Sequence, residues 1–183
     1  TRYDAANQVV GTIAYATPVD KKPTGWFSAF ELRGLLKPNA ADIAEYRYYD
    51  GAGRLAMTVG GTGNVVAMRY DGNGNLIERT AYAARLPAAN IGSAQMPAAP
   101  TASPTYDQRQ RTVYDALNRA VLQIDGLGGV MRQRYDANGN VVERMAYAGR
   151  IPVETAMTEA AINTALAAVA DSARDQRAVN VYD

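Results

Sequence analysis

Residues 49–83 read YDGAGRLAMTVGGTGNVVAMRYDGNGNLIERTAYA, and residues 114–148 read YDALNRAVLQIDGLGGVMRQRYDANGNVVERMAYA. The two segments align without a gap at an offset of 65 residues. The start of the chain, from Arg2 to Ala16, matches the second half of the same unit. Such a period is typical of repeat proteins, in which one supersecondary unit stacks on copies of itself.

A four-residue turn signal recurs every ten or eleven residues within each repeat. Its first residue is usually aspartate, which accepts backbone N–H bonds, and its fourth is Gly or Asn. These two residue types enter the left-handed region cheaply, whereas others lose roughly 1–2 kcal/mol there. A type I turn followed by a left-handed residue is a common hairpin connection. The predicted first and fourth turn residues are Asp4 and Asn7, Asp50 and Gly53, Gly60 and Gly63, Asp71 and Gly74, Asp115 and Asn118, Asp125 and Gly128, and Asp136 and Gly139.

Between the turns lie short runs rich in Val, Ile, Leu, Met, Thr and Tyr, such as residues 54–59, 64–70 and 75–83, and these runs predict strands. In the second run the apolar Val66, Met68 and Tyr70 alternate with Ala67 and Arg69, as expected for a strand with one face packed inward. The sequence therefore predicts a mainly β protein. Tandem antiparallel β-hairpin repeats of about 65 residues should form an extended or spiralling sheet, with short α-helical inserts between repeats.

Tyrosine recurs at equivalent places in the repeat: Tyr3, Tyr15, Tyr49, Tyr70, Tyr82, Tyr114, Tyr135, Tyr147 and Tyr182. The rings are either platforms on which sugars stack or covers for the sheet whose hydroxyls reach solvent. Recurrence in every hairpin favours the structural role, because a ligand site does not need a copy in each one.

The pattern divides the chain into repeats and inserts. Hairpin segments are expected at residues 1–16, 43–84, 106–149 and 179–183, and inserts at residues 17–42, 85–105 and 150–178. The first hairpin segment is the second half of a repeat, and the last is the start of another. We therefore expect the sequence to be part of a longer chain, since repeats need stacked neighbours.

Two of the three inserts carry helix signals. Residues 155–176 predict an amphipathic helix capped by Thr155 or Thr158, with Met157, Ile162, Leu166, Val169 and Ala173 at three- and four-residue spacing. Residues 26–36 predict a short helix, with Ser28 and Glu31 as a capping box. The Ala- and Pro-rich residues 86–105 predict an extended or poorly ordered loop. Trp26, Phe27 and Phe30 either form a partner-binding patch or pack the helix onto the sheet, and we expect packing.

The composition excludes several kinds of site. The chain has no cysteine and no histidine, so thiolate and imidazole ligands, a cysteine nucleophile and a histidine base are absent. With 19 basic and 18 acidic residues it offers no footprint for nucleic acid. The apolar residues 160–170 are too few to span a membrane. We therefore expect no catalytic residue, cofactor, metal site or membrane span in this segment, and no enzyme activity.

Three local patterns imitate functional motifs. Residues 71–75 and 136–140 alternate oxygen side chains as calcium loops do, but the EF-hand glycine and glutamate are missing and turn chemistry explains the same residues. Residues 51–56 fit a loose dinucleotide fingerprint, yet they lie between two predicted strands. The recurring pairs Glu78-Arg79 and Glu143-Arg144 are interpreted as solvated or cross-strand ion pairs rather than acid–base machinery.

The phrases YDGNGN at residues 70–75, YDANGN at residues 135–140 and YDGAGRL at residues 49–55 resemble the YD-repeat consensus of bacterial RHS proteins, toxin-complex shells and animal teneurins. The likeness covers roughly half of the chain. Members of that family are large secreted or surface chains whose hairpins spiral into a hollow β-shell, often around a toxin, while others are adhesins. The resemblance implies an extracellular or cell-surface location in a bacterium. The Asp-Pro motif that ends the repeats of toxin-shell members does not occur here.

These observations predict a structural or adhesive repeat segment of a large secreted or cell-surface protein, built as a fibre or stalk. One alternative is part of a shell that encapsulates a toxin, and another is a carbohydrate-binding module that uses exposed tyrosines. The expected partners are adjacent repeats and other copies of the chain, with a glycan or cell-surface ligand as a further candidate.

Overall fold

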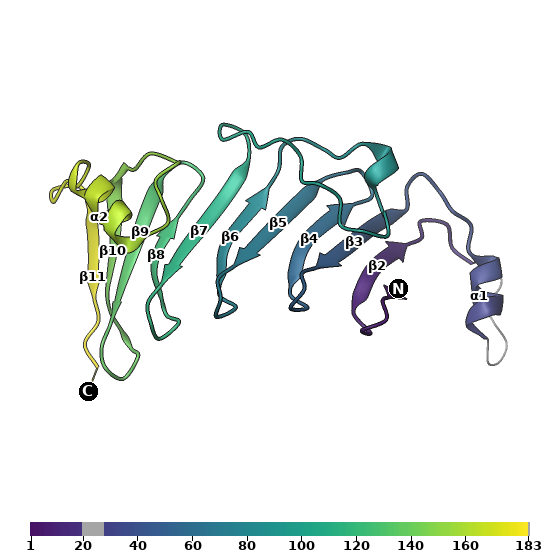
Figure 1. The fold of residues 1–183 in the computed structure, drawn as a ribbon, viewed down its shortest axis with the longest axis horizontal. Helices are drawn as coiled ribbons and strands as arrows, with labels where there is room; N and C mark the ends of the chain where they lie inside the picture. Colours follow the sequence, from purple (N-terminus) through teal and green to yellow (C-terminus); the bar gives the residue numbers. More distant parts are fainter. Residues whose placement is uncertain (20–27, 183) are drawn as a thin grey trace. The chain divides into compact units, whose positions relative to one another are not determined.

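The computed structural model describes residues 1–19 and 28–182, and it is built mainly of antiparallel β-hairpins, which confirms the predicted fold class (Figure 1). The chain forms two compact units. The first comprises Thr1–Val65 and Arg85–Ala99, and the second comprises Val66–Ala84 and Pro100–Asp183.

The first compact unit contains four strands that pair in chain order, each antiparallel to the next. They are β1 (Arg2–Tyr3), β2 (Val9–Ala14), β3 (Ile43–Tyr49) and β4 (Leu55–Gly60). The unit also contains the helix α1 (Ala29–Leu35) and the 3₁₀ turn η1 (Ala88–Asn90).

In the second compact unit the strands also pair in chain order and antiparallel. They are β5 (Val65–Tyr70), whose first residue belongs to the first compact unit, β6 (Leu76–Ala81), β7 (Gln108–Tyr114), β8 (Ala120–Ile124), β9 (Gly129–Tyr135), β10 (Val141–Arg150) and β11 (Gln176–Val179). The helix α2 (Glu159–Ala167) lies between β10 and β11 in the sequence.

Along the strands of each compact unit, tyrosine–aspartate turns alternate with connections at the opposite end of the hairpins. The latter are either long inserts or short turns, such as that from Gly60 to Gly63 after β4 and that from Asp125 to Gly128 between β8 and β9. The tyrosine–aspartate turns join β1 to β2, β3 to β4, β5 to β6, β7 to β8 and β9 to β10, at one end of the hairpins. The long inserts leave from the opposite end, as Figure 1 shows for the loops that carry η1 and α2. We call these ends the turn edge and the insert edge.

One face of each group of strands is covered by an insert, and the core lies there. In the second compact unit, Ile162 and Leu166 of α2 pack against Leu122, Ile124 and Val130 of β8 and β9. In the first, residues from the second insert cover β3. The Tyr48 hydroxyl donates to the carbonyl of Ser93 at 3.2 Å, and Leu86 of the same insert is buried. We call this the covered face.

The third insert forms a helix that is shorter than the predicted residues 155–176. α2 begins at Glu159 because Thr158 caps it, its hydroxyl accepting the N–H of Ala161 at 3.2 Å. Thr155 instead donates to the carbonyl of Pro152. The helix ends at Ala167, and beyond it the Asp171 carboxylate accepts the N–H of Ala173 in a local turn, a competition with helical bonding that is common for aspartate and keeps these residues out of the helix. Met157 and Val169 nevertheless pack against the core as the spacing predicts.

The first insert forms the predicted capping box. The hydroxyl of Ser28 accepts the N–H of Glu31, and the Glu31 carboxylate accepts the N–H of Ser28. The prediction that Phe30 packs the helix onto the sheet is wrong, because Phe30 is 87% exposed and no residue of α1 is buried. Helical spacing shows which residues share a face but not whether a sheet lies opposite it. Trp26 and Phe27 lie outside the described residues.

The middle insert, residues 86–105, has no α-helix and no strand, in agreement with its Ala- and Pro-rich sequence, and contains only η1. Within the described part of the chain, none of the helices has the length and apolar character that a membrane crossing requires.

Candidate functional site: the turns and the contacts between hairpins

Each tyrosine–aspartate turn is built around its aspartate. The Asp50 carboxylate accepts the N–H groups of Ala52 and Arg54, both at 2.9 Å, and Asp115 accepts those of Leu117 and Arg119 in the same way. The same oxygen accepts corresponding N–H groups in the turns of Asp4, Asp71, Asp136 and Asp125. The carboxylate therefore replaces the solvent that would otherwise bind these turn amides.

The fourth residue of each predicted turn has a positive φ: Asn7, Gly53, Gly63, Gly74, Asn118, Gly128 and Gly139. Two of these glycines have a second role at the insert edge. The carbonyl of Gly63 accepts the N–H of Leu86, and the carbonyl of Gly128 accepts the N–H of Ile151, each at 2.9 Å. The start of each insert thus folds back onto the neighbouring short turn at the insert edge, which lies one hairpin earlier in the chain.

The tyrosine of a turn does not direct its hydroxyl to solvent, as the sequence suggests, but bonds to the preceding hairpin. Tyr135 donates to the carbonyl of Ala120 at 3.0 Å, and Ala120 lies six residues after Tyr114. Equivalent bonds run from Tyr49 to Val9, from Tyr114 to Leu76 and from Tyr182 to Val141. The acceptor is always the residue six places after the tyrosine of the previous turn. We call this series the tyrosine ladder.

A second set of contacts runs forward from the turns of Asp4, Asp71 and Asp115 to the next tyrosine–aspartate turn. Gln8 donates its side-chain amide to the carbonyl of Gly53. In the second compact unit, Asn73 and Asn75 donate to the Asn118 side chain, and Arg119 donates to the carbonyl of Asp136. Successive turns are therefore linked in both directions along the turn edge.

Of the other repeat tyrosines, Tyr15, Tyr82 and Tyr147 lie toward the insert edge, and Tyr3 and Tyr70 lie at the turn edge. Tyr147 packs against the core, with the Arg132 guanidinium 5.8 Å from its ring centroid. Tyr82 is half-buried, and burial raises the pKa of its hydroxyl. Tyr15 is also half-buried, whereas Tyr3 is exposed, and Tyr70 is half-buried in β5. These tyrosines do not gather into one site.

Three aspartates that sequence analysis missed close the inserts. Asp42, Asp107 and Asp175 each accept the N–H of an alanine just before the insert, at 2.8–2.9 Å from Ala16, Ala83 and Ala148. The second carboxylate oxygen accepts an N–H from within the insert, that of Asn39, Ser103 or Asp171. The signal was present in the sequence, since each of these aspartates stands eight residues before the aspartate of a tyrosine–aspartate pair.

Strands on either side of an insert are also joined by ion pairs. Glu78 of β6 lies between Arg69 of β5, at 3.5 Å, and Arg109 of β7, at 3.1 Å, and its side chain is only 13% exposed. Glu143 of β10 lies in the same way between Arg134 of β9 and Arg177 of β11. The recurring Glu-Arg pairs therefore do not bond within the dipeptide, because successive residues of a strand point to opposite faces.

One position under the insert is occupied by different residues in the two compact units. Arg111, four residues after Asp107, is buried and donates to the carbonyl of Thr155 at 3.0 Å. Burial lowers the pKa of its guanidinium. Tyr46 stands four residues after Asp42, and its ring lies against Gly92. Each residue holds the following insert on the covered face.

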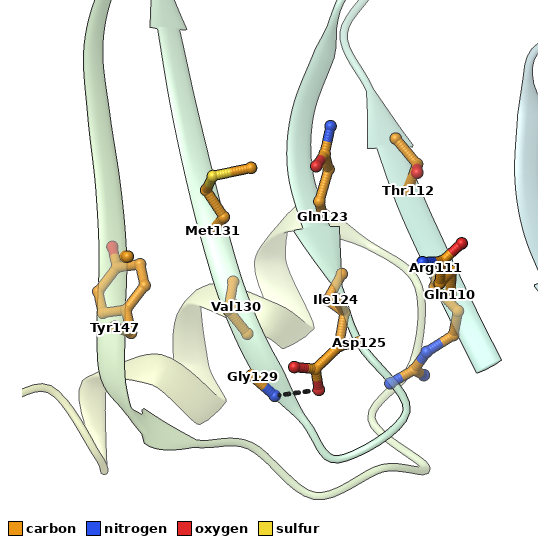
Figure 2. A pocket seen from close by; sticks show the side chains of 11 residues that line it. Gln110, Arg111, Thr112, Gln123, Ile124, Asp125, Gly129, Val130, Met131 and Tyr147 are labelled. Atoms are coloured by element: carbon orange, nitrogen blue, oxygen red, sulfur yellow. Dashed lines mark hydrogen bonds between the residues drawn. The ribbon is translucent and has the colours of Figure 1, made fainter. Parts of the chain in front are cut away.

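A cavity of about 550 Å³ opens among β7, β8 and β9 (Figure 2). Its lining includes Gln110, Thr112, Gln123, Asp125 and Met131. The Asp125 carboxylate is already bonded to the Gly129 N–H, the dashed contact in Figure 2. The other lining residues are Arg111, which is bonded to the Thr155 carbonyl, and residues with amide, hydroxyl or apolar side chains, which suit binding by hydrogen bonds and contact. Within the described residues, acidic side chains do not gather in groups of three or more that could hold a metal ion.

Hydrogen bonds within the turns lower the pKa of the turn aspartates. The N–H of Arg54 lowers the pKa of Asp50 and that of Arg119 lowers the pKa of Asp115. The side-chain amides of Asn75 and Asn140 lower the pKa of Asp71 and of Asp136. Because hydrogen bonds to a carboxylate favour its charged form, each turn is more stable when its aspartate is ionised.

Acid is therefore expected to weaken the fold in a defined window. Since the folded-state pKa values lie below the ordinary value of about 3.9, the stabilisation is complete above that pH and is lost as the pH falls through the lowered values. Urea unfolding between about pH 6 and pH 2 should show a constant midpoint down to about pH 4 and a steep fall below it. The variant Asp136→Asn should show a shallower fall, and an equal slope in both proteins would contradict this assignment.

Removing one rung of the tyrosine ladder gives a second expected result. The variant Tyr135→Phe keeps the ring but loses the bond to the Ala120 carbonyl, and should lower the free energy of unfolding by roughly 0.5–1.5 kcal/mol. Tyr106→Phe, at a largely solvated ring, is the matched control and should change the free energy by less than about 0.5 kcal/mol. Urea titrations followed by circular dichroism measure both, and indistinguishable curves would sink the role given to the hydroxyl.

Comparison with known proteins gives a limited result. No protein-family model matches the chain, and no curated protein matches it. Among solved structures, the chain is similar to one described as "Crystal Structure of TcdB2-TccC3-Cdc42", with 13% sequence identity and a TM-score of 0.43. The match covers 80% of this chain and 7% of that one, so the chain spans a small part of that protein's length.

Proposed function

We propose that this chain is a structural repeat segment of a large secreted or cell-surface bacterial protein, in which tandem hairpins build a fibre or stalk. The observation that carries the proposal is the tyrosine ladder. Each bond joins one hairpin to the preceding one at the same position of the repeat, from Tyr49 to Val9 and again from Tyr135 to Ala120. Because each of these bonds depends only on the preceding hairpin, the same contact can recur along any number of tandem hairpins.

The polar residues that recur from repeat to repeat stabilise the sheet itself. The turn aspartates bind turn amides, the ladder hydroxyls bind carbonyls, and Glu78 and Glu143 bind arginines on neighbouring strands. Groups engaged in this way are not available to act on a substrate. We therefore propose a structural role without catalysis, with adjacent repeats and further copies of the chain as the principal partners.

The proposal is tested by imaging the protein purified from its natural source by negative-stain electron microscopy. Elongated particles, whose length grows with the number of 65-residue repeats in the gene, are the expected result. Closed hollow particles would overturn the fibre and favour the shell that the YD-repeat resemblance also implies. Protease treatment of intact cells tests the location, because a surface protein is cleaved without lysis and an internal one is not.

A further inference from the structure

Tyr106 stands apart from the other tyrosines. It is not a repeat position, since the residue before the insert-closing aspartate is Ala41 in the first insert and Arg174 in the third. Its side chain is 74% exposed, whereas most repeat tyrosines are half-buried. Leu127, at the tip of a neighbouring turn, is 61% exposed. Packing therefore does not explain why a large aromatic ring stands at this place.

The two exposed side chains border a cavity of about 370 Å³, which also includes Arg79, Gln108, Gln110 and Asp125 in its lining. Gln110 and Asp125 belong at the same time to the 550 Å³ cavity, which extends the surface to Thr112 and Gln123 (Figure 2). Both volumes fall within the range of small-molecule sites. All of these residues belong to the second compact unit.

This surface lies on the face of the strands opposite the covered face. Gln110 is the cross-strand partner of Arg79, so their side chains share one face, while the adjacent Arg111 lies buried beneath the third insert on the other. Gln108, Gln110 and Gln123 are all exposed. The surface is therefore open to solvent along its length.

The chemistry of the lining selects the ligand. Three glutamines offer amide donors and acceptors, and Arg79 and Asp125 balance each other in charge, so neither an anion nor a cation is favoured. An aromatic ring at one end presents an apolar face beside these polar groups. Sugars match this combination, because a pyranose has an apolar C–H face and a rim of hydroxyls that both donate and accept.

We propose that the surface running from Tyr106 through Gln108 and Gln110 to Gln123 binds a neutral polysaccharide, with the sugar ring stacked on Tyr106. The site goes beyond the proposed structural role, because it uses a tyrosine that the ladder does not use. It also differs from the ladder tyrosines, whose hydroxyls bond to the preceding hairpin. The sheet supplies the glutamines, and the residue directly after the second insert supplies the aromatic ring.

Affinity electrophoresis of the 183-residue chain through gels that contain yeast mannan, xylan, β-1,3-glucan or hydroxyethyl cellulose tests this site. At least one of these polysaccharides should retard the chain. The variant Tyr106→Ala should weaken binding to it by about 10-fold, the loss of one aromatic contact. Gln110→Ala should weaken it as well. Tyr106→Phe, which keeps the ring, should bind like the parent, and so should Leu117→Ala, which removes an exposed side chain on the turn edge.

Two results would overturn the site: no retardation in any of the four gels, or equal retardation of the parent chain and Tyr106→Ala. Thermal unfolding of Tyr106→Ala should match that of the parent, because an exposed ring adds little to the fold. A loss of binding with an unchanged melting curve then assigns the effect to the site. The structural role is judged separately by imaging, so either proposal can fail without the other.

Discussion

The variant Gly128→Ala is expected to unfold more easily by about 3 kcal/mol or more. Gly128 has a φ of +82°, where an alanine loses roughly 1–2 kcal/mol. A Cβ at this position would lie 2.0 Å from the carbonyl oxygen of Ile151, a backbone atom that cannot move alone. Relief of the clash requires breaking the bond from the Ile151 N–H to the Gly128 carbonyl and exposing Ile151. This loss should lower the free energy of unfolding by roughly 1–3 kcal/mol more.

Gly139→Ala is the matched control for this experiment. Gly139 has a nearly identical φ of +88°, but apart from its two chain neighbours no residue has an atom within 4 Å of the position that the added methyl group would take. It should therefore lose only the roughly 1–2 kcal/mol of the left-handed backbone. Urea unfolding followed by far-ultraviolet circular dichroism compares the two variants. Equal destabilisation would show that the return of the third insert onto this turn contributes nothing to stability.

The variant Ile162→Ala should destabilise the second compact unit by roughly 2–5 kcal/mol. Ile162 of α2 is 0% exposed and packs against Leu122, Ile124 and Val130, so its truncation leaves a cavity between the helix and the strands. Limited proteolysis should then cut the third insert faster, because α2 is held on the covered face chiefly by such contacts.

Leu117→Ala supplies the comparison for Ile162→Ala. Leu117 is similar in size but 68% exposed in a turn, so its truncation should change the free energy of unfolding by less than about 0.5 kcal/mol. If Ile162→Ala behaves like Leu117→Ala, the packing of α2 on β8 and β9 is not a source of stability and the insert is only tethered to the sheet.

The hairpins could be predicted because their determinants are local. A turn such as that from Asp136 to Gly139 contains its own acceptor and its own left-handed residue, so four residues suffice to specify it. The alternation of apolar and polar residues then sets which face of each strand is buried. Non-local partners were harder to predict. The acceptor of the Tyr135 hydroxyl is Ala120, whose carbonyl any residue would provide, so no side-chain pattern identifies it.

The inserts show the same limit. The cap of α2 at Thr158 is local, and its buried residues follow from helical spacing. The helix does not extend through residues 171–176, where Asp171 bonds to its own turn and to Arg174. Whether an apolar residue of an insert is buried depends on what lies opposite it, which is why Ile162 is enclosed and Phe30 is not. Asp107 was missed because its partner Ala83 is 24 residues away in sequence.

The aspartates that close the inserts allow the insert sequences to vary while the pairing of the strands stays the same. Asp42, Asp107 and Asp175 clasp segments whose ends are 26, 24 and 27 residues apart, although those segments share little sequence. The entropy of closing a loop changes only slowly with its length, so the bond between the alanine N–H and the aspartate tolerates insertions and deletions in the insert between them. New peptides grafted between an alanine and its aspartate would leave strand pairing intact. Natural selection, or a protein engineer, can therefore diversify what this scaffold displays without redesigning it.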